Sequence, residues 1–240
     1  MKYLKSVVQY ECMTSFKYIW IFYAIQYAIV SLITLIIGIS MGTFENIGTN
    51  ALEINTLIYV GILGVLGFKE DFKMLIQNGF TRKYIFAATF SLFCFISGIM
   101  AFVDMATGNI IHHFNDRYIS LYGGIYGYGN LFMNWLWLFL VYVLICCLLY
   151  LVILVINKVG KTTSIYLGVI LGGIVLLTVA LFRYVFSDET VNNILKFFMK
   201  TMGFMESGSV NYILPVLTLF ILVGIFSVVS FAIIRHTELK

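Results

Sequence analysis

The stretch Lys69–Lys83, KEDFKMLIQNGFTRK, carries six charges and lies between two long hydrophobic runs. It is predicted to form a short helix, because Glu70 and Asp71 fall in a first turn, where the helix dipole favours anions. Gly79 stands where a left-handed C-cap favours a residue without Cβ. Thr81 can then cap the next helix. The stretch is thus a charged helical segment in a chain that is otherwise mostly apolar.

This predicted helix also has an apolar ridge. Phe68, Phe72, Leu75 and Ile76 are spaced at i, i+4, i+7 and i+8, which places them on one helical face. Such a ridge on a charged helix either contacts another protein or lies flat on the lipid surface. Both interpretations are open from the residues alone.

Composition indicates the solvent in which the rest of the chain folds. Of 240 residues, 61% are hydrophobic and 11% are charged, with one proline. A soluble domain of this size would leave too much apolar surface in water, so the bilayer is the main solvent. The hydrophobic runs are long and continuous rather than alternating, which favours helices over a barrel. The sequence therefore predicts an all-α integral membrane protein made of a single transmembrane domain, residues 1–240.

Six transmembrane helices are predicted, and their order gives the chain its organisation. They span about 18–41, 51–68, 84–105, 131–156, 164–186 and 210–234. Residues 1–17 combine apolar residues at near-helical spacing with Lys2 and Lys5, which predicts an amphipathic interfacial helix. Residues 108–130 are expected to be a loop rich in Tyr and Gly.

Residues 187–209 are neither a span nor a plain loop. Their apolar side chains are interrupted by Lys196, Lys200 and Glu206. This pattern predicts an external amphipathic helix that is half-sunk in the outer leaflet or covers the mouth of a pathway. Simple burial at the surface explains it equally well.

Basic residues predict the orientation. The side that holds the termini, 69–83 and 157–163 carries eleven Lys and Arg, whereas the other side has four. Cytoplasmic loops are enriched in basic residues, so both termini and the charged helix are expected in the cytoplasm. The net charge of +4 comes from these loops and does not indicate nucleic acid.

Motifs that imitate catalytic sites carry little weight. The run 160–163, GKTT, resembles the end of a phosphate-binding loop, but Val155 stands where that loop needs glycine. His112 and His113 are adjacent, and neighbouring histidines seldom face one metal ion. Four cysteines without metal-ligand spacing are expected to be reduced packing residues: Cys12, Cys94, Cys146 and Cys147. No catalytic residue, bound cofactor or metal is predicted for this chain.

Polar and small residues within the spans have a simple distribution. Glu53, Asn55 and Asp104 lie near the predicted outer ends, where water is expected to reach them. The lack of a midplane carboxylate argues against an ion-driven carrier. Small residues allow helix backbones to approach closely, and they predict packing seams without naming the partner. These small residues are Gly61, Gly64 and Gly67 on the second span, and Gly168 and Gly172 on the fifth.

Together, the order of the elements resembles the permease subunits of type-2 ABC exporters, which have the G-type fold. The resemblance covers the whole chain as an architecture. Its most specific local match is Lys69-Glu70-Asp71 followed by Leu75 and by 78–83, NGFTRK, a pattern similar to the family's acidic helix and Gly-x-Ser/Thr-Arg-Lys turn.

The resemblance implies roles for three groups of residues. The charged helix would be the coupling helix that docks on a separate ATPase subunit, through Lys69, Glu70, Asp71, Phe72, Lys73, Leu75, Ile76 and Arg82. The second and fifth spans would form the translocation seam, through Glu53, Asn55, Gly61, Gly64, Gly168 and Gly172. An external gate would consist of Phe197, Phe198, Met202 and Met205.

The resemblance also implies partners and a location. Two copies of this chain, or this chain and a related one, would work with two ATPase subunits, which would bind the ATP and Mg. The complex would lie in a bacterial cell membrane and export amphipathic peptides or lipophilic compounds, as in antimicrobial resistance. The sequence has no large extracellular domain of the kind found in permeases that sense antimicrobial peptides. It also has no aromatic stripe along a span, as a sugar-chain channel would need, so polysaccharide fits less well. The alternative function is a partner-independent channel or small secondary carrier.

Overall fold

The computed structural model describes residues 2–42, 50–67, 73–206 and 208–235. Side chains of residues 2–7, 10, 73 and 74 are not described. These ranges form nine α-helices and contain no β-strand, only an isolated bridge between Phe204 and Val210. The helices are α1 (Lys2–Met41), α2 (Glu53–Leu66), α3 (Lys73–Gln77), α4 (Arg82–Phe114), α5 (Leu121–Tyr126), α6 (Leu131–Val159), α7 (Lys161–Tyr184), α8 (Asp188–Thr201) and α9 (Ile213–Arg235).

Five of the described helices are long and apolar enough to cross a membrane: α1 over Glu11–Met41, and the whole of α4, α6, α7 and α9. This supports the predicted all-helical, multi-pass membrane protein. Helix α2 is apolar but has 14 residues, so it is about 21 Å long against a hydrocarbon core of about 30 Å. The second predicted span, 51–68, is therefore shorter than expected.

The N-terminal region differs from the prediction. Residues 1–17 do not form a separate helix, because α1 continues without a break from Lys2 to Met41. The first glycine of the chain is Gly38, and no proline interrupts the helix. Nothing in the sequence therefore ends a helix at residue 17.

The region between the third and fourth spans also differs. Helix α4 runs on to Phe114, nine residues past the predicted end of its span, and α5 follows within the expected loop. Ser120 caps α5, since its side-chain oxygen accepts a hydrogen bond from the Gly123 N–H at 3.0 Å. Gly127 ends it with φ of 78°, a left-handed conformation that favours glycine.

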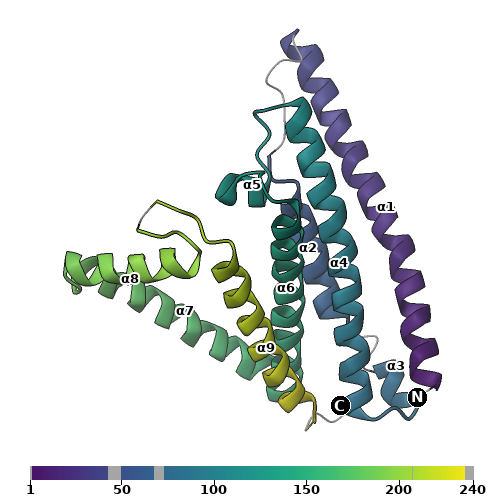
Figure 1. The fold of residues 1–240 in the computed structure, drawn as a ribbon. Coiled ribbons are helices and arrows are strands. Elements are labelled where there is room, and N and C mark those ends of the chain that lie inside the picture. Colours follow the sequence, from purple (N-terminus) through teal and green to yellow (C-terminus); the bar gives the residue numbers. More distant parts are fainter. Residues whose placement is uncertain (1, 43–49, 68–72, 207, 236–240) are drawn as a thin grey trace.

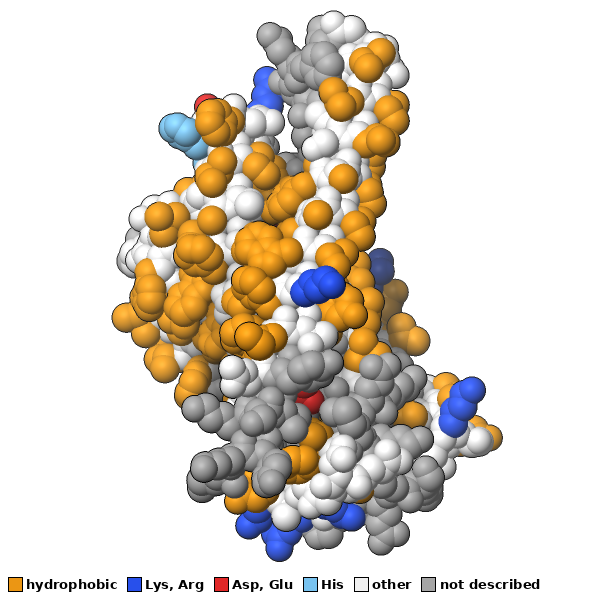
Figure 2. Space-filling model, turned by 90° about the vertical axis from the view of Figure 1, so that its right-hand side faces the viewer, with side chains coloured by type: hydrophobic (Ala, Val, Ile, Leu, Met, Phe, Trp, Pro, Cys, Tyr) orange, Lys and Arg blue, Asp and Glu red, His pale blue; other side chains and the backbone are white. Residues whose placement is uncertain are grey.

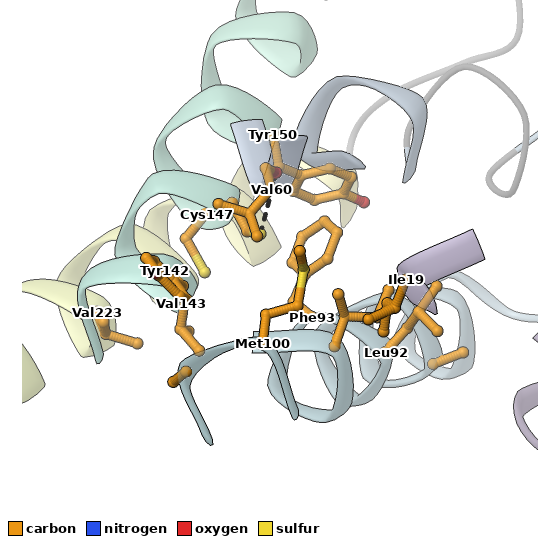
Figure 3. Close-up of a cluster of buried hydrophobic side chains, with 14 of the residues drawn as sticks. Ile19, Val60, Leu92, Phe93, Met100, Tyr142, Val143, Cys147, Tyr150 and Val223 are labelled. Carbon is orange, nitrogen blue, oxygen red and sulfur yellow. Dashed lines mark hydrogen bonds between the residues drawn. The ribbon is translucent and has the colours of Figure 1, made fainter. Parts of the chain in front are cut away.

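Helix α6 lies at the centre of the bundle and packs against α2, α4 and α9 (Figure 1). Figure 3 shows the apolar side chains that meet there, among them Val60, Met100 and Val143, which are all buried. Glycine permits the closest contact: a Cβ on Gly64 would lie 2.6 Å from the backbone oxygen of Cys146. Gly64 therefore lets α2 pack directly on the α6 backbone.

One end of the molecule gathers the segments that were predicted to be cytoplasmic. The start of α1, the short α3, the α6–α7 turn and the end of α9 all lie at the lower end in Figure 1. A hydrogen bond of 2.7 Å from the Arg82 guanidinium to the Arg235 carbonyl ties the start of α4 to the end of α9. Above this end, hydrophobic side chains cover much of the face shown in Figure 2. The exposed apolar residues of α1 include Leu32, Ile36 and Ile39.

Candidate functional site

Helix α7 has an unusual environment for a helix of this protein. It leaves the end of α6 and diverges from α9, and α8 crosses its far end (Figure 1). None of its residues is buried, and every residue from Ile165 to Ala180 is exposed. We call α7 and α8, residues 161–201, the α7–α8 arm. From Ile165 to Ala180, the apolar helix α7 is therefore exposed on all its faces in the described structure.

The two glycine pairs predicted to form a seam have different surroundings. A Cβ added to Gly168 or Gly172 would meet no atom within 4 Å among the described residues. In contrast, a Cβ on Gly61 would lie 2.9 Å from Leu149 Cδ1, and Gly64 is closed by Cys146. Gly61 and Gly64 thus allow α2 to pack on α6 within the chain. Gly168 and Gly172 are not packed against another helix among the described residues.

Helix α8 lies between α7 and α9, in the stretch that was predicted to form an external amphipathic helix. Ser187 caps it, and the hydrogen bond from the Thr190 N–H to the Ser187 hydroxyl is 3.4 Å long. The predicted gate residues Phe197, Phe198 and Met202 are exposed, whereas Met205 is half-buried. The Tyr126 hydroxyl donates a hydrogen bond of 2.9 Å to the Met202 carbonyl, which fixes the end of α8 to α5.

The predicted coupling helix is described only in part. Lys69, Glu70, Asp71 and Phe72 lie outside the described residues, as does the side chain of Lys73. Helix α3 covers the remaining turn, and Gly79 has φ of +78°. The Gly79 N–H bonds to the Ile76 carbonyl at 2.9 Å and the Phe80 N–H to the Leu75 carbonyl at 3.1 Å. The predicted left-handed C-cap at Gly79 is confirmed.

The apolar ridge of this helix points partly into the chain. Leu75 is 1% exposed and belongs to the hydrophobic core, and Ile76 packs against the same core. Leu75 therefore anchors α3 to the bundle and is not available to a partner, which corrects the prediction for this residue. Thr81 precedes α4 at the N-cap position, but its side chain makes no capping hydrogen bond.

A buried polar cluster was missed from the sequence. Asp104 is 2% exposed, and its two carboxylate oxygens accept hydrogen bonds from the Tyr23 hydroxyl at 2.9 Å and the Tyr142 hydroxyl at 2.6 Å. These tyrosines come from α1 and α6, so one carboxylate joins three helices. The expectation that water reaches Asp104 was wrong. The signal in the sequence was the spacing of Tyr23, Gln26 and Tyr27, which places polar groups on one face of α1.

Glu53 belongs to the same cluster and was also expected at an open outer mouth. It is 2% exposed, and one of its oxygens accepts a hydrogen bond from the Leu121 N–H at 3.3 Å. Asn55, by contrast, is exposed. Segment 118–121 covers Glu53. Burial raises the pKa of Tyr118 in this segment above its usual range. Glu53 therefore lies beneath a lid of backbone and tyrosine.

The motifs set aside in the sequence behave as packing and turn elements. Gly160, with φ of 92°, forms the tight turn between α6 and α7, so the GKTT run follows a helix and not a strand. The His112 ring stacks on Tyr128 with centroids 3.7 Å apart. Within the described ranges, no group of three metal-ligating side chains is present, and the four cysteines are free.

Comparisons of the chain with protein-family models, curated proteins and solved structures found no match.

Proposed function

We propose that this chain is the membrane-spanning permease subunit of an ATP-driven ABC exporter, which acts with a separate ATPase subunit. Its substrates are amphipathic peptides or lipophilic compounds. The observation that carries the proposal is the exposed α7–α8 arm. Its apolar helix α7 has no buried residue in a single copy, which is expected of a subunit that packs against a second one. The chain is placed in a bacterial cell membrane with both termini in the cytoplasm.

The arm supports a second copy of this chain, or a related chain, as a partner. Lipid alone can solvate an apolar helix, so exposure is not enough to require a protein partner. Gly168 and Gly172, however, form a flat strip that no described residue occupies. Small residues at i and i+4 let two membrane helices approach closely, and association then comes from backbone packing. We assign the translocation route to the seam between two such arms, with Phe197, Phe198 and Met202 at its outer end.

The charged end supports an ATPase partner. Residues 73–83, the described part of the charged stretch 69–83, lie at the end of the molecule where α1 begins and α9 ends (Figure 1). Leu75 fixes α3 to the bundle from within. We propose that the preceding residues Lys69, Glu70, Asp71, Phe72 and Lys73, most of which lie outside the described residues, contact the ATPase. In this arrangement ATP and Mg bind to the ATPase, and this chain binds neither.

A partner-independent carrier remains the second candidate, and one observation favours it. Glu53 and Asp104 are two buried acidic residues that interact electrostatically, and buried ionisable residues in membrane proteins mark proton and ion pathways. The sequence-based argument against a carrier was the lack of a carboxylate at the membrane midplane, together with the expectation that water reaches these acids; their burial removes the second part of that argument.

The experiment is purification of the tagged chain from its native membrane in mild detergent, followed by mass spectrometry and an ATP-hydrolysis assay. We expect a chain with a complete phosphate-binding loop to copurify and to hydrolyse ATP. A matched pair of variants tests the docking end: Asp71→Arg reverses a charge there, and Asp116→Arg makes the same change at the opposite end. Only Asp71→Arg should reduce the bound ATPase. A chain that purifies alone and dissipates a proton gradient in liposomes would instead be a carrier.

A further inference from the structure

The pair Glu53 and Asp104 holds two acidic groups in one buried site. Both residues are 2% exposed, and they lie close enough to interact electrostatically. Glu53 comes from the start of α2 and Asp104 from α4. Among the described residues, the titratable side chains that face the pair are all tyrosines: Tyr23 and Tyr27 from α1, Tyr118 from segment 118–121 and Tyr142 from α6.

No positive charge balances these acids. Among the described residues, the ion pair between Lys196 and Glu206 is far from the pair in the fold, on α8 and the loop after it, and no lysine, arginine or histidine contacts Glu53 or Asp104. The stretch 43–49 that leads toward α2 is not described, but its sequence TFENIGT contains no basic residue. Two buried carboxylates without a cation repel each other and lose their hydration, so one of them takes up a proton.

The hydrogen bonds indicate which of the two is ionised. Both oxygens of Asp104 accept from tyrosine hydroxyls: Tyr142 donates at 2.6 Å, and Tyr23 shares its single proton between Asp104 at 2.9 Å and the Met100 carbonyl at 3.1 Å. An ionised carboxylate can only accept hydrogen bonds, and two donors stabilise it. Glu53 receives one N–H on Oε1, from Leu121, while its Oε2 has no hydrogen-bond partner among the described residues. An unpartnered oxygen is far less costly on a neutral acid than on a buried carboxylate.

We propose that Glu53 is a proton-binding site: at neutral pH it holds one proton beneath segment 118–121, while its neighbour Asp104 is ionised and held by two tyrosines. The site is tied to the lid because Leu121 donates to Glu53, and Gly108 packs against the same oxygen. Release of the proton to water requires segment 118–121 to move away from Glu53. The inference is independent of the ATPase partner and stands whether or not one binds.

The test is infrared spectroscopy of the purified chain at neutral pH. A protonated carboxyl group has a carbonyl stretching band that is separate from the bands of carboxylates. We expect the wild-type protein to show such a band, Glu53→Gln to lose it and Asp104→Asn to keep it. Loss of the band in Asp104→Asn alone would place the proton on Asp104 and overturn the proposal. A wild-type spectrum identical in this region to that of Glu53→Gln would overturn it as well.

Two controls keep the test decisive. Glu206→Gln removes an exposed carboxylate, whose side chain is 81% exposed, and should leave the protonated band unchanged. Glu53→Gln is the neutral counterpart of a protonated glutamic acid and keeps an oxygen for the Leu121 N–H, so its thermal transition at neutral pH should match that of the wild type. If Glu53→Gln does not fold, labelling of the chain with carboxyl-¹³C-glutamate replaces that variant. The labelled chain carries Glu11→Gln, because Glu11 is a second, half-buried glutamate on α1. The band should shift with labelled glutamate, and a band that fails to shift contradicts the assignment to Glu53.

Discussion

Replacing Gly168 and Gly172 with leucine separates a role in folding from a role in association. A Cβ at either position meets no described atom within 4 Å, so the leucines should cause no clash within the chain. Glycine is about 1 kcal/mol less favourable than alanine inside a helix, and leucine is nearly as good as alanine. The double variant should therefore fold at least as stably as the wild type. At a seam between two copies, the same side chains would push the helices apart.

The expected loss of association follows from the cost of overpacking. Adding bulk to a closely packed contact typically costs about 1–3 kcal/mol per site, and each 1.4 kcal/mol is a factor of about ten in affinity. With one pair of glycines on each side of the seam, we expect dimerisation to weaken by roughly a hundredfold or more. The control is Gly64→Leu, whose Cβ would lie 2.6 Å from a backbone oxygen of α6. That variant should destabilise the single chain.

Two measurements on the same preparations decide the outcome. Thermal unfolding in detergent reports the stability of the chain, and crosslinking of Ile170→Cys between copies in native membranes reports association. We expect Gly168→Leu with Gly172→Leu to keep its thermal transition and lose the crosslink. Retention of the crosslink, or its absence in the wild-type background, would refute the assignment of the seam to α7. A lowered thermal transition would show that the glycines pack within the chain after all.

Four further predictions concern other parts of the molecule. Asn115→Cys should react with an impermeant label from outside intact cells, whereas Lys161→Cys should not, because the basic loops are expected in the cytoplasm. Phe72→Ala should release the ATPase while the chain stays folded, since burial of a Phe side chain contributes about 1.5–3 kcal/mol to a contact; copurification measures this. Leu75→Ala should instead lower the unfolding temperature, because loss of a buried leucine costs about 2–5 kcal/mol. Tyr142→Phe should destabilise the chain by about 1.5–3 kcal/mol, since it removes a hydrogen bond to a charged group, as thermal unfolding will show.

Three of these predictions have a control or an outcome that would contradict them. For topology, labelling of Lys161→Cys from outside would overturn the whole orientation. For docking, undiminished copurification of Phe72→Ala would remove the role of the apolar ridge. For Tyr142, the matched variant is Tyr27→Phe, whose hydroxyl donates a 3.0 Å hydrogen bond to the neutral, half-buried Thr107. It should cost less, about 0.5–1.5 kcal/mol. Equal losses in the two tyrosine variants would contradict an ionised Asp104.

Local rules predicted the elements that depend on few residues. The left-handed turn at Gly79 followed from the need for a residue without Cβ, and the turn at Gly160 from the polar break between two apolar runs. The long helices α6, α7 and α9 followed from continuous apolar stretches. These features depend on residues that are close together in the sequence, so the sequence alone predicts them.

Features that depend on contacts between helices were not predictable in the same way. Asp104 looked accessible because it stood near the end of an expected span, yet tyrosines from α1 and α6 enclose it. Leu75 looked exposed on its charged helix, but α3 folds back onto the bundle and buries it. The spacing of glycines on α2 and α7 is similar, and only the packing of α6 against α2 distinguishes their roles. Burial of this kind is set by tertiary neighbours, which a single sequence does not specify.

Native mass spectrometry of the complex extracted from its own membrane tests the central claim most directly. We predict a particle with two permease chains, either two copies of this chain or one copy with a related chain, together with two ATPase chains. The particle should lose its ATPase chains when Phe72 is replaced with alanine and split between the permeases when Gly168 and Gly172 are replaced with leucine. A wild-type chain that is found alone, without a second permease or a nucleotide-binding partner, would contradict the account.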